Sequence, residues 1–525
     1  MSDDYGTVEV PNYPVPDPSL VIGPEAAADD WQQAKGERKI DADVCIVGTG
    51  PGGASAAREL ARAGLRVVLL EEGPARQRFK PNQSHTARYH MQEGGLMVAR
   101  GRVGFPVAAG RGVGGGTLIN SALSFRTPSA VLNRWAAEMA APQWSHAAMQ
   151  PIYEHVERIA GVGITREEIS GRNNQIVVDG VRKMGLVGGF APRSTPGCKG
   201  CGICNYGCPT RGKASTNLTF LPDAVANGAL IQADTKVIDV LTEGDRVVGV
   251  VGVVRHPDTG EQVGTVEVRA PRVILSAGAI GTPRLLWHCG LAERMGSAIG
   301  EGLHVHAGSA VLGVHDDPVH LWTGATQGAY FVDPTQPGVL PHTFTAPPEA
   351  CLATLGKVGK SLSEGLSILP RLSGLIVLVS DESTGSVRSF SDGRADVTYD
   401  VGDDDLKRTI SGLVVAAKVL MAGGAKQVTA PIHGVGFHTN VESFHAALLT
   451  RKVTDLTMYA AHPMSSCRMG LDRDRSAIGP DGQSHHIRGL YLADASIFPS
   501  SLGVNPQLTT MAAGTVIGRG MASGT

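Results

Sequence analysis

The fold of this chain is indicated by residues 43–72, which read DVCIVGTGPGGASAARELARAGLRVVLLEE. Residues 43–47 form a short apolar run, residues 48–53 a glycine-rich turn, and residues 54–63 an alanine-rich helical segment. A second apolar run, residues 66–70, follows. Strand, glycine turn, helix and strand in this order are typical of the unit that binds a dinucleotide in a Rossmann-type fold. The sequence therefore predicts an α/β fold with a dinucleotide site.

Three of the four glycines of this turn have a physical reason to be glycine. Gly48 permits the tight bend, Gly50 lets the backbone approach a pyrophosphate, and Gly53 lets the helix pack closely on the strand. Glu71 ends the second strand eighteen residues after Gly53, near the spacing of about twenty expected of the acid that binds a ribose hydroxyl. The adjacent acid, Glu72, is the competing candidate for that contact.

A second glycine-rich stretch, residues 110–120, reads GRGVGGGTLIN. So many glycines do not suit a regular helix or strand, and a flexible loop is the simplest interpretation. The flanking segments are apolar, however, which favours an ordered segment whose backbone approaches a second part of a large cofactor.

The composition excludes some classes of protein. The chain has 525 residues, long enough for two hydrophobic cores, and 42% of them are hydrophobic. Its formal net charge is −2 with Lys and Arg spread along the sequence, so we expect no nucleic-acid partner. No run approaches the roughly 18 apolar residues of a membrane span, and residues 1–39 lack a basic leader with an apolar segment. We therefore expect a soluble, cytoplasmic protein with no transmembrane segment, whose residues 1–39 form an arm on the surface.

Four of the eight cysteines fall in one short run, Cys198, Cys201, Cys204 and Cys208, followed by Pro209. The pattern C-x2-C-x2-C-x3-C-P is the run by which bacterial ferredoxins hold iron–sulfur clusters, so the sequence predicts a cluster here. A tetrahedral zinc site, disulfides and a loop without metal are the alternatives. In two-cluster ferredoxins the fourth cysteine serves the other cluster, which leaves a three-iron cluster open beside a four-iron one.

Four separate motifs resemble those of the glucose–methanol–choline (GMC) flavoprotein oxidoreductases. They are the first glycine turn with Glu71, residues 110–120, residues 278–286 (GAIGTPRLL), and the C-terminal block that contains HPMSSCRMG at 462–470 and GVNPQLT at 503–509. The C-terminal words look closest to the branch of cholesterol oxidases and long-chain alcohol oxidases. The resemblance implies FAD rather than NAD, with Glu71 on the adenosine ribose. The cofactor-binding positions that it implies are Gly48, Gly50, Gly53, Glu71, Gly114, Gly115, Thr117, Asn120, Val237, Asp494 and Pro506.

The same resemblance implies a catalytic pair, His462 and Asn505. Oxidation of an alcohol by hydride transfer to flavin N5 needs a base for the hydroxyl proton and a polar group that fixes the oxygen. Imidazole titrates near neutral pH, so His462 suits the first role, and Asn505 suits the second. Many GMC members carry a second histidine at the position of Asn505, and asparagine there is typical of the sterol oxidases. His304 and His306 are expected to have structural roles.

The predicted function is FAD-dependent oxidation of a hydrophobic alcohol, whether alicyclic, terpenoid, sterol-like or long-chain. Electrons would leave through the cysteine-bound cluster to an acceptor protein. One alternative is an oxygen-using alcohol oxidase whose cysteine loop is structural. Others are a lyase or light-driven decarboxylase of the same fold, and an electron-transfer subunit without a small substrate.

The predicted domains are discontinuous. The FAD-binding domain takes residues 40–126, 217–314 and 454–525, and a substrate domain with an antiparallel sheet takes residues 127–216 and 315–453. The cysteine-rich loop, residues 197–213, lies at their junction. Alternation of apolar and polar residues predicts strands at 236–240, 246–255 and 265–268, and a buried strand at 272–276. In the substrate domain it predicts that residues 395–399 are one strand of the antiparallel sheet and that the helix 404–421 packs against this sheet.

Overall fold

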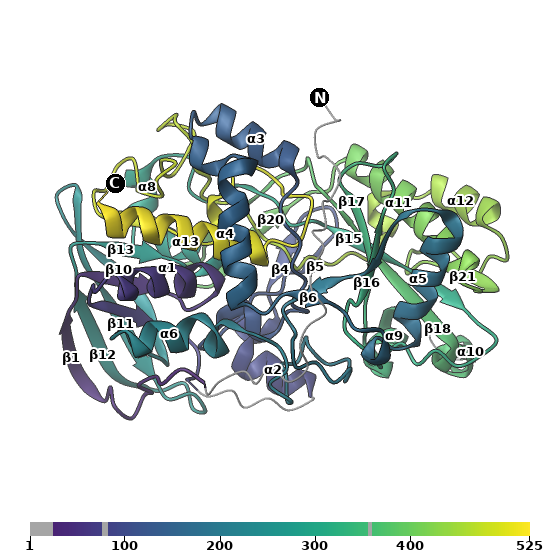
Figure 1. Cartoon of the computed structure of the whole chain (residues 1–525), viewed down its shortest axis with the longest axis horizontal. Coiled ribbons are helices and arrows are strands. Elements are labelled where there is room, and N and C mark those ends of the chain that lie inside the picture. The colour runs from purple at the N-terminus through teal and green to yellow at the C-terminus, as the bar shows by residue number, and fades with distance from the viewer. Residues whose placement is uncertain (1–24, 76–81, 355–359, 525) are drawn as a thin grey trace.

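The computed structural model describes residues 25–75, 82–354 and 360–524. The molecule is elongated (Figure 1). One half contains the glycine-rich N-terminal unit and the C-terminal helix, and the other half contains a second sheet with its own helices. None of the helices in these ranges combines the length and the apolar composition that a bilayer crossing requires.

A five-stranded parallel sheet forms the centre of the first half. Its order is β22 (Leu490–Leu492), β13 (Val273–Leu275), β2 (Val44–Val47), β3 (Val67–Leu70) and β9 (Leu230–Gln232). The helices α1 (Pro51–Arg62) and α13 (Gln507–Ser523) pack on each other beside it. A Cβ at Gly514 would lie 2.2 Å from the carbonyl oxygen of Gly52, so only glycine permits this approach. The predicted strand–turn–helix–strand unit is present.

A four-stranded sheet lies next to the parallel sheet in the order β1 (Gly36–Asp41), β12 (Gln262–Arg269), β11 (Arg246–Arg255) and β10 (Thr235–Glu243). The last three strands pair antiparallel and match the predicted meander. β1 pairs parallel to β12, so the last residues of the expected arm, from Gly36, form part of a strand.

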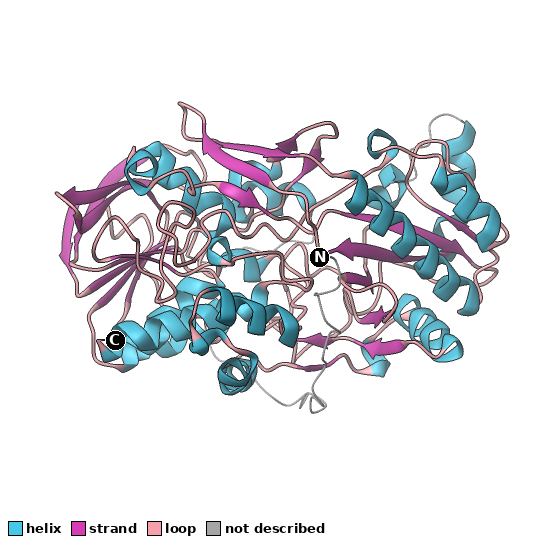
Figure 2. Ribbon diagram, turned by 90° about the horizontal axis from the view of Figure 1, so that it is seen from above, coloured by secondary structure: helices cyan, strands magenta, loops and turns pink. Residues whose placement is uncertain are grey.

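The second half is built on a six-stranded antiparallel sheet. Its order is β21 (Gln427–Thr429), β15 (Gly308–Val314), β18 (Leu372–Val379), β17 (Val339–Thr343), β16 (Ala329–Val332) and β7 (Val187–Phe190). The helices α11 (Asp403–Ala422) and α5 (Arg172–Met184) lie against it, as the view from above shows (Figure 2). The pairing places residues 308–314 with the antiparallel sheet rather than with the parallel one.

One strand of the second half differs from the prediction. The predicted helix is α11, and it packs on β15, β17 and β18 of the antiparallel sheet, as expected. The predicted strand at 395–399 is β20 (Ala395–Tyr399), but it is not a strand of that sheet. β20 belongs to a separate five-stranded sheet with β14 (Glu301–Leu303), β19 (Gly385–Ser389), β4 (Val98–Arg100) and β5 (Phe105–Pro106). The six-stranded sheet offers the broader apolar surface, and burial of that surface decides where a helix packs.

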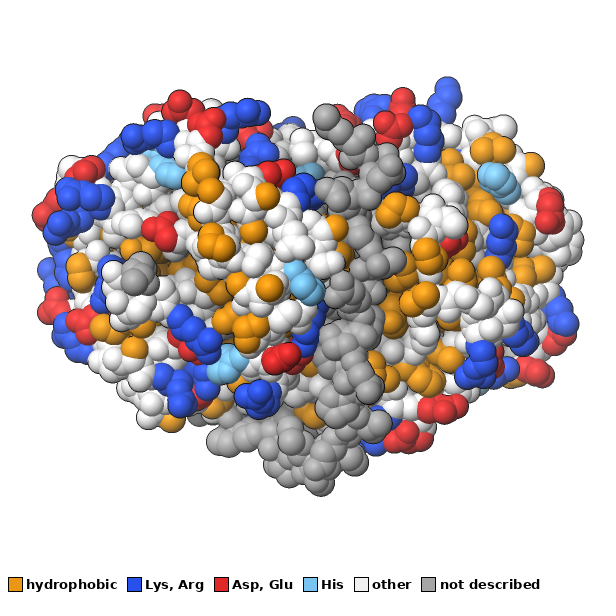
Figure 3. Space-filling view, turned by 45° about the horizontal axis from the view of Figure 1, so that its top comes forward, with side chains coloured by type: hydrophobic (Ala, Val, Ile, Leu, Met, Phe, Trp, Pro, Cys, Tyr) orange, Lys and Arg blue, Asp and Glu red, His pale blue; other side chains and the backbone are white. Residues whose placement is uncertain are grey.

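The remaining elements connect these sheets or cover them. The helices are α2 (Gln83–His90), α3 (Ser129–Glu138), α4 (His146–Ile159), α6 (Phe220–Ala226), α7 (Gly278–His288), α8 (Leu291–Met295), α9 (Pro348–Thr354), α10 (Lys360–Ile368) and α12 (Val441–Leu449), and a small ribbon joins β6 (Gly163–Ile164) to β8 (Pro192–Arg193). On the face drawn in Figure 3, basic and acidic side chains are interspersed, and hydrophobic side chains lie between them.

Candidate active site

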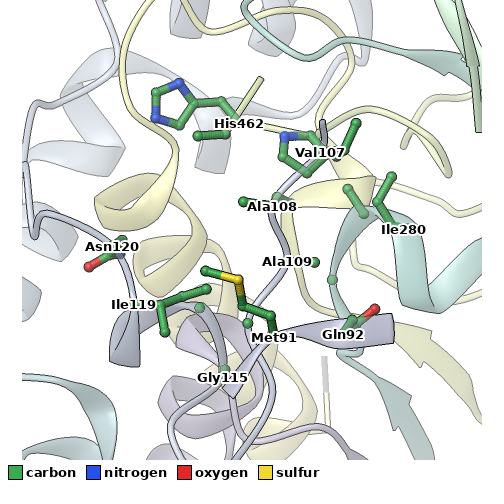
Figure 4. A pocket seen from close by; sticks show the side chains of 18 of the residues that line it. Met91, Gln92, Val107, Ala108, Ala109, Gly115, Ile119, Asn120, Ile280 and His462 are labelled. Carbon is green, nitrogen blue, oxygen red and sulfur yellow. The ribbon is translucent and has the colours of Figure 1, made fainter. Parts of the chain in front are cut away.

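A large cavity of about 700 Å³ lies where the two halves of the molecule meet, within the usual size range of cofactor sites. Figure 4 shows part of its wall, with His462 at one end, Gly115 at the other, and Ile119 and Ile280 on opposite sides. The cavity is bordered by the first glycine turn, by the segment 110–120, by the start of α7 and by the C-terminal block. All four motifs singled out in the sequence therefore reach one cavity.

The two glycine-rich segments contact each other beneath this cavity. A Cβ at Gly115 would lie 2.6 Å from the Cα of Gly50, so glycine is needed at position 115. Gly48 is needed for a different reason, because it has φ of +102° and its Cβ would lie 2.3 Å from the carbonyl oxygen of Ser276. By contrast, a Cβ at Gly116 would meet nothing within 4 Å. No side chain of these glycines covers the backbone where it faces the cavity, so the phosphates of a large cofactor such as FAD can approach the backbone N–H groups there.

Glu71 ties the two glycine segments together. Its carboxylate accepts hydrogen bonds from the backbone N–H of Thr49 (3.1 Å), Gly73 (3.0 Å) and Gly112 (3.0 Å), and from the Thr49 hydroxyl (2.6 Å). Burial raises the pKa of this carboxyl, and the hydrogen bonds oppose the rise. Glu71 borders the cavity, as Glu72 does, and the ribose contact that the resemblance implies stays a prediction.

Asp494 holds the start of α7 against the C-terminal block. One carboxylate oxygen accepts from the backbone N–H of Gly278 (2.9 Å) and from the hydroxyl of Thr282 (2.6 Å), and the other accepts from the N–H of Ser496 (2.8 Å). Burial raises the pKa of Asp494. The residue borders the cavity, and its carboxylate lies at the N-terminus of α7, where the helix dipole favours a negative charge.

His462 and Asn505 are brought together at the cavity, although 43 residues separate them. The Nε2 atom of His462 lies 2.9 Å from the Nδ2 atom of Asn505. Their other polar atoms, Nδ1 of His462 and Oδ1 of Asn505, are buried without a hydrogen-bond partner among the described residues. Burial lowers the pKa of His462 well below 6.5, and the nearby His306 and His342 lower it further. The pair is thus a neutral imidazole and an amide with unsatisfied hydrogen-bonding capacity.

A buried carboxylate, Asp381, anchors the structure behind this pair. It accepts hydrogen bonds from the N–H of Val305 (2.7 Å) and His306 (3.2 Å) and from the hydroxyls of Tyr399 (2.7 Å) and Ser501 (2.9 Å). Its pKa lies well below the usual range because these donors and the adjacent histidines outweigh the cost of burial. Sequence reasoning missed Asp381, and the only signal was an acid just after an apolar strand.

His306 links Asp381 to the catalytic pair. Its ring meets that of His462 edge to face with centroids 5.5 Å apart, and its Nε2 lies 2.9 Å from the Ser501 hydroxyl. Burial lowers its pKa to about 4, so it is neutral at pH 7. His304, with Nδ1 at 3.6 Å from the carboxylate of Asp381, joins the same cluster. The structural roles expected of both histidines stay a prediction.

The other predicted cofactor positions divide into two groups. Those that border the cavity are Gly48, Gly50, Gly115, Asn120, Val237 and Pro506. Gly53, Gly114 and Thr117 lie behind its wall: a Cβ at Gly53 would meet the carbonyl oxygen of Gly48 at 2.3 Å, and the Thr117 hydroxyl bonds the carbonyl of Gly114 (2.5 Å). These three shape the turns rather than face the cavity.

The four cysteines of the run surround a second, much smaller cavity of about 10 Å³. All four are free thiols, so the disulfide alternative is not realised. Within the described ranges, no three His, Cys, Asp or Glu side chains are placed to hold a single metal ion. The thiols thus face a common point without converging on one ion.

The cysteine loop is fastened to the segment 110–120. The Nζ atom of Lys213 donates to the carbonyls of Leu118 (2.8 Å), Asn120 (2.8 Å) and Cys204 (3.0 Å). Two residues of the loop, Asn205 and Tyr206, also border the large cavity. No residue of the described ranges borders both cavities, but Asn205 directly follows Cys204, so the cysteine loop lies next to the large cavity.

Comparisons with known proteins agree with this geometry. Models of the GMC oxidoreductase family match residues 87–308 and 381–514, and a model described as an FAD binding domain matches residues 41–91. An uncharacterized GMC-type oxidoreductase of Mycobacterium tuberculosis is 33% identical over 90% of this chain and 74% of its own length. The long-chain-alcohol oxidase FAO1 of Arabidopsis thaliana is 29% identical over 90% of this chain and 65% of its own length. The crystal structure of pyridoxine 4-oxidase from Mesorbium loti superimposes with a TM-score of 0.70 at 17% identity, covering 91% of this chain and 98% of that one.

Proposed function

The chain belongs to the GMC oxidoreductases, which makes it an FAD-dependent oxidoreductase, and on that premise we propose that it oxidises a hydrophobic alcohol to the carbonyl compound. The observation that carries the proposal is the meeting of His462 and Asn505 at the wall of the large cavity, each with an unsatisfied buried polar atom.

The residues of the pair take different parts in this reaction. FAD, when bound, supplies the acceptor for the hydride, so an alcohol that loses its C–H hydride and its hydroxyl proton leaves as the carbonyl. His462 takes the hydroxyl proton at Nε2, the ring nitrogen to which the amide of Asn505 donates, because its lowered pKa keeps the imidazole neutral and this atom able to accept. Asn505 holds the substrate oxygen, which fixes the orientation of the carbon-bound hydrogen.

The surroundings of the pair favour an apolar substrate. The cavity wall near His462 and in the antiparallel half includes Phe344, Ile376, Met458, Tyr459 and Ala461. Such a wall gives an alkyl chain or an alicyclic ring a place to leave water. The long-chain-alcohol oxidase relative supports the same class of substrate. The proposal assigns FAD to the predicted FAD-binding domain and the alcohol to the predicted substrate domain.

We also propose an exit for the electrons through the cysteine loop. The position of Asn205 supports this route, because it follows Cys204 directly and borders the large cavity, which puts the cysteine loop next to the cofactor site. An iron–sulfur cluster there would pass one electron at a time to an acceptor protein, so each turnover reduces two acceptors by one electron each. The oxygen-using oxidase stays the alternative, and the name of the relative is what favours it.

Anaerobic flavin reduction tests the alcohol reaction. The protein is mixed without oxygen with dodecanol, a monoterpenoid alcohol or a sterol, and bleaching of the flavin absorbance is followed. We expect reduction by at least one of them, and His462→Ala should slow it by about 10²–10⁴-fold, the usual contribution of a general base. His445→Ala, an exposed histidine on α12, is the matched control and should react at the unaltered rate.

Admission of air separates the two electron acceptors. Slow reoxidation without stoichiometric peroxide supports the acceptor-protein route, and rapid reoxidation with peroxide establishes the oxidase. If no alcohol of the panel reduces the flavin and His462→Ala leaves the protein's activity intact, the proposed reaction is wrong and a non-oxidative use of the fold is favoured.

A further inference from the structure

One face of the six-stranded sheet forms part of the wall of the large cavity. The other face lies against α11, because a Cβ at Gly412 of this helix would lie 2.5 Å from Cγ1 of Val377. Successive residues of a strand point to opposite faces, so Ile376 points away from α11. Ile376 pairs with Ala310 of β15, and both residues border the cavity. The sheet thus gives the cavity an apolar floor.

Two aromatic rings lie on this floor, one on either side of that pair. The ring of Tyr459 contacts Gly308, because a Cβ there would lie 3.5 Å from Cε1 of the tyrosine. The ring of Phe344 covers Gly374, where a Cβ would lie 2.6 Å from Cε1 of the phenylalanine. The strand register separates the two glycines by four residues, which is about 13 Å along the strands. Both aromatic residues border the cavity, so a ring-sized apolar frame can lie between them.

The backbone of Tyr459 is fixed close to the catalytic pair. Its N–H donates to the carbonyl of Gly308, and its own carbonyl accepts from the N–H of Gly308, both at 3.2 Å. Tyr459 precedes His462 by three residues, so their Cα atoms are at most about 11 Å apart. One small substrate can therefore contact both side chains.

The hydroxyl of Tyr459 has no hydrogen-bond partner among the residues that the structure describes. Burial raises the pKa of Tyr459, and no hydrogen bond adds to that rise or opposes it. A tyrosine hydroxyl withdrawn from bulk water ordinarily bonds to another group, because leaving it without a partner costs free energy. Since Tyr459 borders the cavity, a bound ligand can supply the partner.

The surroundings define which group of a ligand suits this hydroxyl. In the described ranges, no Lys, Arg, Asp or Glu of the second half borders the cavity, so a charged group would lose its hydration there without a counter-charge. The matching group is therefore an uncharged oxygen. The reacting hydroxyl has its own partners in the proposed reaction, because His462 takes its proton and Asn505 holds its oxygen. The oxygen that faces Tyr459 is thus a second one.

We propose that Tyr459 is a specificity-determining residue whose hydroxyl donates a hydrogen bond to a second, uncharged oxygen of the substrate. The inference rests on the proposed function and narrows its substrate class to hydrophobic alcohols with a further oxygen on an alicyclic frame. The frame lies on Ala310 and Ile376, between the rings of Tyr459 and Phe344. Tyr459 takes no part in the transfer of the proton or the hydride, so it affects binding and leaves the chemical step unchanged.

Tyr459→Phe tests the inference, because it removes one oxygen and keeps the ring. Anaerobic flavin reduction is followed at increasing concentrations of cyclohexanol and of cyclohexane-1,2-, 1,3- and 1,4-diol. We expect at least one diol to bind the wild type about tenfold more tightly than cyclohexanol, the contribution of one hydrogen bond. In Tyr459→Phe this preference should fall to about twofold, which two equivalent hydroxyls supply by themselves, and the limiting rate should not change. Tyr491→Phe on β22, which does not border the cavity, is the matched control and should keep the preference.

A second measurement separates this inference from the proposed function. The 2-, 3- and 4-methoxycyclohexanones have a second oxygen but no hydroxyl to oxidise, and the ethylcyclohexanones match them in size. Their binding is read from the absorbance of the oxidised flavin, whether or not any alcohol reacts. Tighter binding of a methoxy compound by the wild type, lost in Tyr459→Phe, supports the second-oxygen site even if no alcohol reduces the flavin and the proposed reaction fails. Equal binding of the matched compounds by the wild type, or a preference that persists in Tyr459→Phe, overturns the assignment.

Discussion

Replacement of Asp381 by asparagine would remove one buried charge from behind the catalytic pair with little change of shape. One oxygen of Asp381 accepts three hydrogen bonds, from the N–H of Val305, the N–H of His306 and the hydroxyl of Tyr399. The amide oxygen of asparagine can keep these three donors. The amide nitrogen then faces the hydroxyl of Ser501, which can accept instead of donating.

The cost follows from the loss of charge. A hydrogen bond to a charged acceptor contributes roughly 1.5–3 kcal/mol and a bond to a neutral acceptor roughly 0.5–1.5 kcal/mol. Three bonds that each lose about 1 kcal/mol make Asp381→Asn less stable by about 3 kcal/mol. The matched control is Asp396 on β20, which pairs with the exposed Arg100 on β4. Asp396→Asn should change stability by less than about 1 kcal/mol.

The same substitution should slow the reaction. His462 becomes positive when it takes a proton, and Asp381 is the acid among the groups that influence its pKa. With an effective dielectric constant of about 20, the interaction between the Asp381 charge and protonated His462 stabilises the protonated ring by about 1–2 kcal/mol. Its loss lowers the rate roughly tenfold. Urea unfolding and anaerobic flavin reduction measure the two effects. Equal stabilities and equal rates for Asp381→Asn and Asp396→Asn would refute the reasoning.

Three further outcomes are expected. The rate of flavin reduction should stay level as the pH falls from about 8 to about 6, because the lowered pKa keeps His462 neutral, and a tenfold fall per pH unit beginning near 6.5 would contradict this. The free energy of unfolding should fall between pH 6.5 and 4, because His306 and His342 have a pKa of about 4 in the folded state and 6.5 when unfolded. The unfolded chain then binds more protons, at a cost of about 3 kcal/mol for each histidine, and equal urea midpoints at pH 7 and 4.5 would exclude it. Gly52→Ala should abolish FAD binding in a fluorescence titration, since its Cβ would lie 1.7 Å from the carbonyl oxygen of Ala493, and an unchanged affinity would disprove that clash.

Local motifs were sufficient to predict much of the fold and the candidate site. The glycine turn between β2 and α1 is readable because its conformation depends on adjacent residues, where only glycine permits a positive φ or a close approach. The three strands of the meander are readable for a similar reason, since alternation with period two is a property of consecutive residues. His462 and Asn505 were predicted from the sequence motifs that contain them, because those motifs carry the family resemblance.

The sequence alone thus determined the dinucleotide unit and the family, and it predicted His462 and Asn505 as the catalytic pair. Only the tertiary structure decided that β20 lies outside the six-stranded sheet, that Asp381 lies close to His306 and His462, and that Arg193 and Lys213 both bond to Cys204. These are relations between segments far apart in the chain. Packing area, desolvation and charge compensation act through space, so they leave no periodicity or spacing in the sequence from which they could be predicted.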